Sequence, residues 1–442
     1  MNNNNNNNVN TLNVRYKPQK WYQWVLYPIQ MLLAVFVATV LIANICGTPI
    51  ASCLIGATVG TIIYELFTGF KSPMFISSCG ATVSAVVGAL ALGGGQNYVA
   101  VAIGGVIIAL VYAIFACIIR FGGRKLFDRI FPPVIVGPVT MIIGLNLAGF
   151  IPTYLSSSVS GNNPKLITWL PILVALITMI IVALTSHYGK GFMKTVAFLI
   201  GLMSGYIICL ILELSGAYNF NIVSTITNIK WFDPKDFAFM NWATSPFEWS
   251  QLPQIILLFL PVSICAALEH YSDHKTLSNI LGTDLTQNPG LHRTLIGDGV
   301  ASAVGTAIGG LPNTSYGESV ATIGFSKVGS IWITMISAII LGVMGFIAPI
   351  TAFINSIPSV VFAGCAMILY GYISTSGLKT IMGAKVNLEN SKNLIIVSVI
   401  LTVGVSGVFF LSESFAGVSL AMVLGIILNL ILKDSEQKIT NN

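Results

Sequence analysis

Long apolar runs recur along the whole chain and are separated by short polar stretches. Each run is about 18–22 residues long, the length that an α-helix needs to cross the hydrocarbon core of a bilayer. The pattern predicts fourteen such segments, so we expect an all-α polytopic membrane protein. The expected ranges are 24–45, 50–69, 73–92, 98–120, 131–151, 167–187, 193–213, 251–271, 292–309, 312–327, 329–349, 356–376, 392–411 and 415–432.

Composition and charge refine this expectation. The 442 residues are 55% hydrophobic and 8% charged, with a mean hydropathy of +0.84. With a cytoplasmic N-terminus, all of the 21 Lys and Arg residues except Lys165, Lys230 and Lys235 fall on the cytoplasmic side, as the positive-inside rule requires. We expect a multi-pass protein of the cell membrane with both termini in the cytoplasm. The net charge of +6 reflects this orientation and does not indicate nucleic-acid binding.

Both ends of the chain are polar. Residues 1–21 include seven consecutive Asn, and we expect them to form a disordered cytoplasmic tail. Residues 434–442 are expected to form a second cytoplasmic tail. The longest connection, about 214–250, is expected outside the cell, where it separates seven segments from seven more.

The two halves of the chain show an internal sequence similarity. In the fifth and twelfth segments, Pro132 matches Pro358 and Met141 matches Met367, at a constant offset of 226 residues. Segments that are seven apart cross the membrane in opposite directions. Two seven-segment repeats would therefore be inverted, which is typical of secondary transporters. Loose matches of this kind also arise by chance in apolar sequence.

The third and tenth segments are interrupted at matching places. Each begins at a proline, Pro73 or Pro312, and continues with small, polar or β-favouring residues before a short apolar helix. Non-helical backbone inside a membrane survives only where it is buried in protein or lines a wet cavity. Paired interrupted segments indicate a transporter's binding site. Two re-entrant loops with structural kinks are the alternative.

Two acids lie within the apolar pattern. Glu269 is in the eighth segment, and Glu318 follows the break of the tenth. An acid at the bilayer centre costs roughly 2.5–3.5 kcal/mol, so the pair predicts a site for a polar solute that crosses the membrane. The alternative for each is a structural acid paired with backbone. Glu65, near a segment end, is expected to be solvated.

Four motifs connect the chain with a known family. They are Pro-Asn-Thr-Ser-Tyr-Gly-Glu-Ser at 312–319, Glu-His at 269–270, Asn-Pro-Gly-Leu-His-Arg at 288–293 and Leu-Tyr-Gly at 369–371. Each resembles a motif of the uracil permease branch of the nucleobase–ascorbate transporter (nucleobase–cation symporter) family. The resemblance runs from about residue 22 to residue 433, and it is most specific over 269–377.

This resemblance implies a fold and an activity. The fold would have two inverted seven-segment repeats, with short antiparallel strands in the breaks of segments 3 and 10. A core domain would comprise residues 22–120 and 251–349, and a gate domain residues 121–250 and 350–433. The activity would be proton-coupled import of uracil or a related nucleobase by alternating access. A homodimer in the lipid bilayer is implied, with no cofactor besides the coupling proton.

The chain departs from the family pattern in the first and third segments. Met31 follows Gln30 where the family usually has His, and Gly80 stands where bacterial uracil permeases have Phe. An aromatic wall of the base pocket would be missing at Gly80. Ala38 matches a small residue that the family places near the base.

The stretch 318–327 bears on the substrate. It keeps Glu318 and Lys327 of the motif of the xanthine and urate branches but misses that motif at Ser319, Ala321 and Ser326. Uracil is therefore favoured over purines. Xanthine, urate or another heterocycle is the alternative.

Uracil presents two N–H donors and two carbonyl acceptors. Ionised carboxylates only accept hydrogen bonds, so Glu269 and Glu318 suit the N–H edges. Backbone amides near Gly80 and Gly317 suit the carbonyls, because glycine lets the backbone come close. Packing is the alternative role for the remaining members of the site. The predicted substrate site comprises Glu269, Glu318, Gly317, Gly80, Tyr316, Tyr370 and Ala38.

The coupling proton needs a carrier. Asp273 lies one helical turn after Glu269 on the same face, and carboxylates that share a low-dielectric site can carry a proton near neutral pH. We expect Glu269 to hold the base while Asp273 or Glu318 takes the proton. Alternatively, Asp273 is a charge at the cytoplasmic helix end. His270 is expected to be a packing histidine, and His274 points about 100° around the helix from Asp273.

Other classes of function fit less well. An anion transporter with this fold would hold two acids in its site, and these would repel an anion. An enzyme would need a nucleophile–base pair or a metal cluster, and no spacing of His, Cys and Asp in the sequence indicates one. We therefore expect a transporter and not an enzyme, with no metal site.

Overall fold

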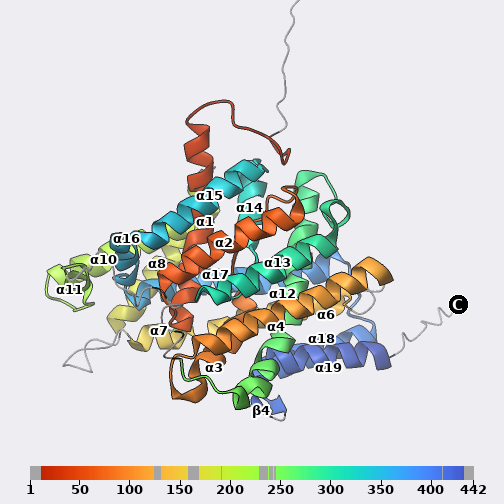
Figure 1. The fold of residues 1–442 in the computed structure, drawn as a ribbon. Coiled ribbons are helices and arrows are strands. Elements are labelled where there is room, and N and C mark those ends of the chain that lie inside the picture. The colour runs from red at the N-terminus through yellow and green to blue at the C-terminus, as the bar shows by residue number, and fades with distance from the viewer. Residues whose placement is uncertain are drawn as a thin grey trace, which may run out of the picture.

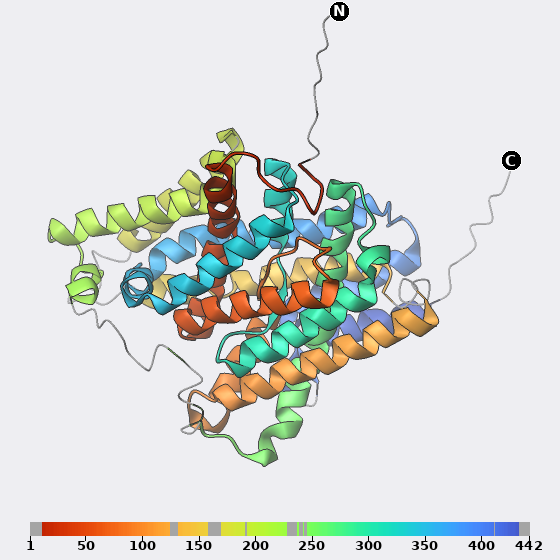
Figure 2. The same ribbon diagram turned by 45° about the horizontal axis from the view of Figure 1, so that its top comes forward.

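The computed structural model describes residues 11–123, 131–157, 169–190, 192–227, 237, 242, 245–410 and 412–432 (Figure 1). The Asn tract and the expected C-terminal tail at 434–442 lie outside these residues. The described chain is mainly helical, as the apolar pattern predicts. Figure 2 shows the same helices in a second view, in which neighbouring helices pack side by side and their axes point in several directions.

The structure contains helices of very different lengths. They are α1 (Gln23–Cys46), α2 (Ile50–Thr68), α3 (Val83–Ala91), α4 (Tyr98–Cys117), α6 (Pro133–Ala148), α7 (Ile151–Ser157), α8 (Trp169–Tyr188), α9 (Phe192–Thr195), α10 (Ala197–Leu214), α11 (Ile222–Thr227), α12 (Leu252–Leu281), α13 (Leu291–Ala307), α14 (Gly317–Ser326), α15 (Ile331–Phe346), α16 (Ala348–Asn355), α17 (Ser359–Gly383), α18 (Ser391–Ser406) and α19 (Val418–Ile431). The strands are β1 (Ile76–Ser78), β2 (Asn313–Ser315), β3 (Phe409–Phe410) and β4 (Ser412–Ala416).

Within the described residues, eight helices are long and apolar enough to cross a membrane. A ninth span is possible if α15 and α16, which meet at a bend of 83°, count as one. Each of the fourteen expected ranges contains a helix, but several of these helices are short. The chain is therefore a multi-pass membrane protein, and the count of fourteen crossings stays a prediction.

The expected disorder of residues 1–21 is wrong for the part that the structure describes. The backbone amides of Gly329 and Ile331 donate to the carbonyls of Thr11 and Val14, at 3.0 and 2.9 Å. The Thr11 hydroxyl donates to the carbonyl of Lys327 at 2.6 Å. Low-complexity composition suggested a tail without partners, but these residues follow the Asn tract and find backbone partners between α14 and α15.

The helices pack in two sets. In the first set α13 lies between α2 and α4, and these three run side by side (Figure 1), while α15 packs on α2 and α12 on α4. In the second set α17 packs against α6 and α8, and α18 packs against α6 and α19. Glycine allows this close approach, because a Cβ at Gly104 of α4 would overlap the ring of Phe259 on α12.

Helices α6 and α17, which contain the internally similar sequences, are direct neighbours. Pro132 precedes α6 and Pro358 precedes α17, where proline's fixed φ suits the start of a helix. A Cβ at Gly137 of α6 would stand 2.9 Å from the carbonyl oxygen of Gly377 on α17. A larger residue at this position would therefore push the two helices apart.

The interrupted third and tenth segments meet at their breaks. Strands β1 and β2 pair antiparallel, with Ile76 opposite Ser315 and Ser78 opposite Asn313. Helix α2 supports β1 from one side: the Thr61 hydroxyl donates to the Ile76 carbonyl at 2.9 Å and accepts from its amide at 3.1 Å. The backbone polar groups at the break therefore have partners, as non-helical backbone inside a membrane requires.

Asn313 ties β2 to two helices. Its side-chain amide donates to the carbonyls of Gly56 on α2 and Ala301 on α13, at 3.0 and 3.1 Å. The same amide lies where a Cβ at Gly60 or Gly305 would stand. Glycine at these two positions gives the Asn313 side chain its space.

We predict that Gly305→Ala destabilises the fold by about 1–3 kcal/mol, because Asn313 cannot move away without losing its hydrogen bonds. Thermal unfolding in detergent measures the effect. Gly383→Ala is the control, because nothing lies within 4 Å of the added Cβ. Equal melting temperatures for the two variants would contradict this account of the packing.

Candidate functional site

Helices α12 and α14 bring three carboxylates together. Glu269 and Asp273 lie one turn apart on α12, and Glu318 is in the first turn of α14. Each side chain is half-buried. Glu269 and Glu318 are near enough to repel each other, and Asp273 interacts with both. A Cβ at Gly317 would lie 3.7 Å from Oδ1 of Asp273, so glycine lets α14 begin close to this carboxylate.

The acids differ in their partners. Oδ2 of Asp273 accepts a hydrogen bond from the Ser315 hydroxyl at 3.1 Å. Oε2 of Glu269 is buried and has no hydrogen-bond partner among the described residues. A buried acceptor without a partner is costly, so this oxygen is a place where a ligand N–H would be stabilised.

The start of α14 faces the same region. The amides of Ser319 and Val320 donate to the carbonyl of Tyr316, and Glu318 hydrogen-bonds its own backbone amide. The amide of Gly317 lies at the N-terminus of this half-helix, where amides lack helical partners and the helix dipole favours acceptors.

The structure places the other predicted residues at different distances from the acids. Buried Tyr316 lies between β2 and α14 and interacts with Glu318 and Glu269. Ala38 is buried in α1, next to Thr39, whose hydroxyl hydrogen-bonds Ser77 of β1 at 2.7 Å.

The two remaining residues face the second set of helices. A Cβ at Gly80 would lie 3.5 Å from a methyl group of Leu147 on α6. Tyr370 is buried in α17 and lies beside Tyr154. Among the described contacts, none brings Tyr370 to the carboxylates. Gly80 meets α6 with backbone alone.

Sequence reasoning missed a fourth buried acid, Asp298 of α13. Its Oδ2 lies 2.5 Å from Nδ1 of His270, 3.4 Å from the Thr314 hydroxyl and 3.3 Å from the Ser315 amide. Asp298 therefore connects α13 to β2 and to His270 on α12. His270 is an ordered partner of an acid, and this is more than the packing role that we expected.

A proton joins Asp298 to His270. The Thr294 hydroxyl lies 3.0 Å from both the Leu291 carbonyl and Nε2 of His270. One proton lies between Nδ1 of His270 and Oδ2 of Asp298, because two acceptors would not approach to 2.5 Å. This bond to the imidazole compensates part of the cost of burying the carboxylate.

A second histidine extends the network. Nδ1 of His274 faces the His270 carbonyl at 2.8 Å, and its Nε2 lies 2.6 Å from the hydroxyl of Tyr64 on α2. The two imidazoles stack at 4.0 Å. On the same helix α2, Glu65 is fully buried, so the expectation that it is solvated is wrong. It accepts from Thr68 at 3.1 Å, and the turn of chain toward β1 covers it.

A signal for Asp298 was present in the sequence. It lies within an apolar segment, where the cost argument that singled out Glu269 applies equally. Glycines flank it, and Gly297 packs on Tyr64 while Gly299 packs on Tyr112. The two glycines let α13 pack closely against α2 and α4 on either side of Asp298.

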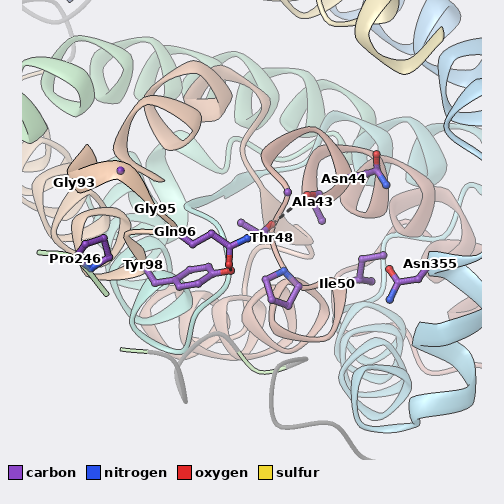
Figure 3. Close-up of a pocket in the computed structure, with 13 residues that line it drawn as sticks. Ala43, Asn44, Thr48, Ile50, Gly93, Gly95, Gln96, Tyr98, Pro246 and Asn355 are labelled. Carbon is purple, nitrogen blue, oxygen red and sulfur yellow. Dashed lines mark hydrogen bonds between the residues drawn. The ribbon is translucent and has the colours of Figure 1, made fainter. Parts of the chain in front are cut away.

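A separate cavity of about 840 Å³ lies away from these acids (Figure 3). Its lining includes Ala43, Asn44, Tyr98 and Asn355. None of the predicted site residues lines it. The chemistry of the acids and this cavity are therefore distinct features of the fold.

Two interrupted segments that face carboxylates inside a polytopic helical fold define a membrane permease. The Permease family (Xan_ur_permease) matches residues 22–413 of the chain. The chain therefore belongs to this family, the nucleobase–ascorbate transporters, as its motifs predict.

Relatives align in sequence with this chain over nearly its full length. The uracil permease of Bacillus caldolyticus is 34% identical over 422 residues, which cover 95% of this chain and 94% of the relative. The uracil permease of Escherichia coli (strain K12) is 32% identical over 409 residues, covering 92% and 90%. These relatives are transporters, in agreement with the expectation that the chain is not an enzyme.

Solved structures share the fold at low sequence identity. The transmembrane domain of the cyanobacterial bicarbonate transporter BicA matches with a TM-score of 0.61 and 13% identity, covering 94% of this chain and 99% of that one. The anion transporter Slc26a9 of mouse, in an inward-facing state, matches with a TM-score of 0.62 and 12% identity, covering 94% and 69%. The arrangement of helices is thus that of a known transporter fold.

We predict that Asp298→Asn lowers uptake at least tenfold while the protein still inserts into the membrane. The amide cannot accept from His270 and from β2 in the same way as the carboxylate, so the strand beside the site loses its support. Substrate uptake per molecule of membrane-inserted protein measures the effect. Asp284→Asn is the matched control, since Asp284 is exposed and bonds Thr286 only two residues away. Wild-type uptake by Asp298→Asn would contradict this role.

Proposed function

We propose that the protein imports uracil, or a closely related nucleobase, together with a proton across the cell membrane by alternating access. The observation that carries this proposal is the buried, unpartnered oxygen of Glu269 beside Glu318, at the meeting point of two interrupted segments. Membership of the family and the names of the relatives agree with it.

The site offers the hydrogen bonds that uracil needs. Glu269 and Glu318 accept from its two N–H groups, while amides at Gly317 and Gly80 donate to its carbonyls. A site that hydrogen-bonds its ligand on several edges discriminates strongly, because a wrong analogue leaves buried groups unpaired. Tyr316 and Ala38 lie in the same region, whereas Tyr370 lies on the gate side beside Tyr154.

The third carboxylate, Asp273, allows transport of the base to be coupled to movement of a proton. Three acids in one half-buried site repel each other, and one proton on Asp273 or Glu318 removes part of that repulsion. Proton entry and base binding then favour each other, which is what a symporter requires. Ser315 holds Asp273 in place through its hydroxyl.

The moving parts follow the two sets of packed helices. We assign residues 22–120 and 251–349 to a core domain that carries the acids, and residues 121–250 and 350–433 to a gate domain. The pairing of α6 with α17 and of β1 with β2 supports two inverted seven-segment repeats. Both termini would be cytoplasmic, and the protein would be a homodimer in the bilayer.

An anion substrate is disfavoured, although related folds carry anions. The likeness to the bicarbonate transporter concerns the fold alone. Glu269, Asp273 and Glu318 would repel an anion in the proposed site, whereas a neutral base meets no such penalty. Xanthine or another heterocycle remains the second candidate within the family.

We predict that Glu269→Gln lowers uracil uptake at least a hundredfold and that Glu318→Gln lowers it at least tenfold, because each replaces an acceptor with a mixed donor and acceptor. Glu389→Gln is the control, since Glu389 is exposed far from the break. Uptake of labelled uracil into cells that lack their own uracil permease measures all three.

Two additions to the same assay separate the alternatives. Excess unlabelled uracil should abolish uptake while excess xanthine leaves it nearly intact, and a proton uncoupler should prevent accumulation. Full uptake by Glu269→Gln would show that the site is wrongly placed. Competition by xanthine but not by uracil would move the substrate to the purines.

A further inference from the structure

The cavity of Figure 3 opens where several helix ends meet on one face of the molecule. It lies between the α1–α2 turn, with Asn44 and Thr48, and the turn before α4, with Gln96 and Tyr98. Asn355, at the end of α16, closes the opposite side. The distribution of basic residues puts these helix ends on the extracellular face.

The lining of this cavity is polar but uncharged. It includes the side chains of Asn44, Thr48, Gln96 and Asn355, and no Asp, Glu, Lys or Arg is among its lining residues. The Tyr98 hydroxyl donates to the Gln96 side chain at 2.9 Å, which orders that wall. Such a lining hydrates a small neutral solute without attracting or repelling ions.

Helix α1 connects this cavity with the candidate site. Ala38 lies beside β1 at the site, and Asn44 lines the cavity six residues later. At a rise of 1.5 Å per residue, Asn44 is about 9 Å further along the helix axis than Ala38. Leu41 is midway between them. A contact to α1 at Leu41 therefore lies, along the helix axis, at a depth between the cavity and Ala38.

Tyr154 makes that contact. Its hydroxyl donates to the Leu41 carbonyl at 3.2 Å, and its side chain is buried. Tyr154 belongs to α7, in the proposed gate domain, whereas Leu41 belongs to the proposed core. The Ser359 hydroxyl, next to the start of α17, donates to the Tyr154 carbonyl at 2.8 Å and holds the tyrosine from the gate side.

We propose that the cavity is the outer vestibule of the transport path and that Tyr154 is the latch that closes the path between the vestibule and the substrate site. This inference rests on the proposed alternating-access transport. The core moves against the gate in that cycle, so the hydrogen bond from Tyr154 to Leu41 must break when the outer path opens. A neutral nucleobase would then pass from the polar vestibule to Glu269 and Glu318.

A native cysteine reports on the latch. Cys79 is buried next to β1, on the site side of Tyr154, and interacts with Glu269. In a variant that retains Cys79 as its sole cysteine, we expect Tyr154→Phe to speed labelling by a membrane-impermeant maleimide from outside about fivefold. This factor is what the loss of one ordinary hydrogen bond produces. Ser359→Ala should act in the same direction with a smaller effect.

Tyr206→Phe is the matched control. Tyr206 is also buried, but its hydroxyl bonds Ser356 at 3.2 Å, within the proposed gate domain. Its removal should leave labelling of Cys79 unchanged. Equal labelling rates for Tyr154→Phe, Tyr206→Phe and the parent would overturn the latch.

The vestibule is tested by blocking it. A bulky maleimide on Asn44→Cys should abolish uptake, whereas the same reagent on Asn219→Cys, exposed in the outer loop, should not. Unhindered uptake after complete modification of Asn44→Cys would overturn the vestibule.

These results remain separable from the identity of the substrate. The labelling experiment needs no uptake, so a change of Cys79 labelling in a protein that does not carry uracil would support the latch and refute only the substrate. Uracil uptake by the parent, together with unchanged labelling in Tyr154→Phe and Ser359→Ala, would refute the latch alone.

Discussion

The fold depends on one requirement: backbone that is not helical inside an apolar layer must find hydrogen-bond partners within the protein. Strands β1 and β2 meet part of this need by pairing with each other. Side chains supply the rest, with Thr61 of α2 bonding both backbone groups of Ile76 and Ser302 of α13 donating to the carbonyl of Asn313. Because these donors come from α2 and α13, the two helices must lie against each other and against the break. Glycines on their facing sides make that approach possible.

The acids differ in the contacts that their oxygens make. One oxygen of Asp298 meets a histidine, a hydroxyl and a backbone amide, whereas its second oxygen, like Oε2 of Glu269, is buried without a hydrogen-bond partner among the described residues. Ser315 occupies one oxygen of Asp273. Asp298 thus ties α12 and α13 to β2, while Glu269 and Asp273 lie where α12 approaches the start of α14.

The pattern of apolar, polar and proline positions predicted the features that depend on residues close together in the chain. The apolar runs placed the helices, the prolines and small residues placed both breaks, and the cost of burying charge identified Glu269 and Glu318. Features that depend on contacts between distant segments could not be predicted in this way. The burial of Glu65 results from the chain that leads into β1, and the order of residues 11–20 results from partners more than 300 residues later. Asp298 was overlooked although its sequence signal matched that of Glu269.

The bonds between residues 11–16 and the connection after α14 have a consequence for biogenesis. The Thr11 hydroxyl and its acceptor, the Lys327 carbonyl, are 316 residues apart in the chain. The ribosome makes the Thr11 side of this contact first, so this segment stays without its partner while most of the helices enter the membrane. It can dock only after α14 and the start of α15 have been inserted. Residues that are made early thus take part in a late step of assembly, and their docking shows that α14 is already in place.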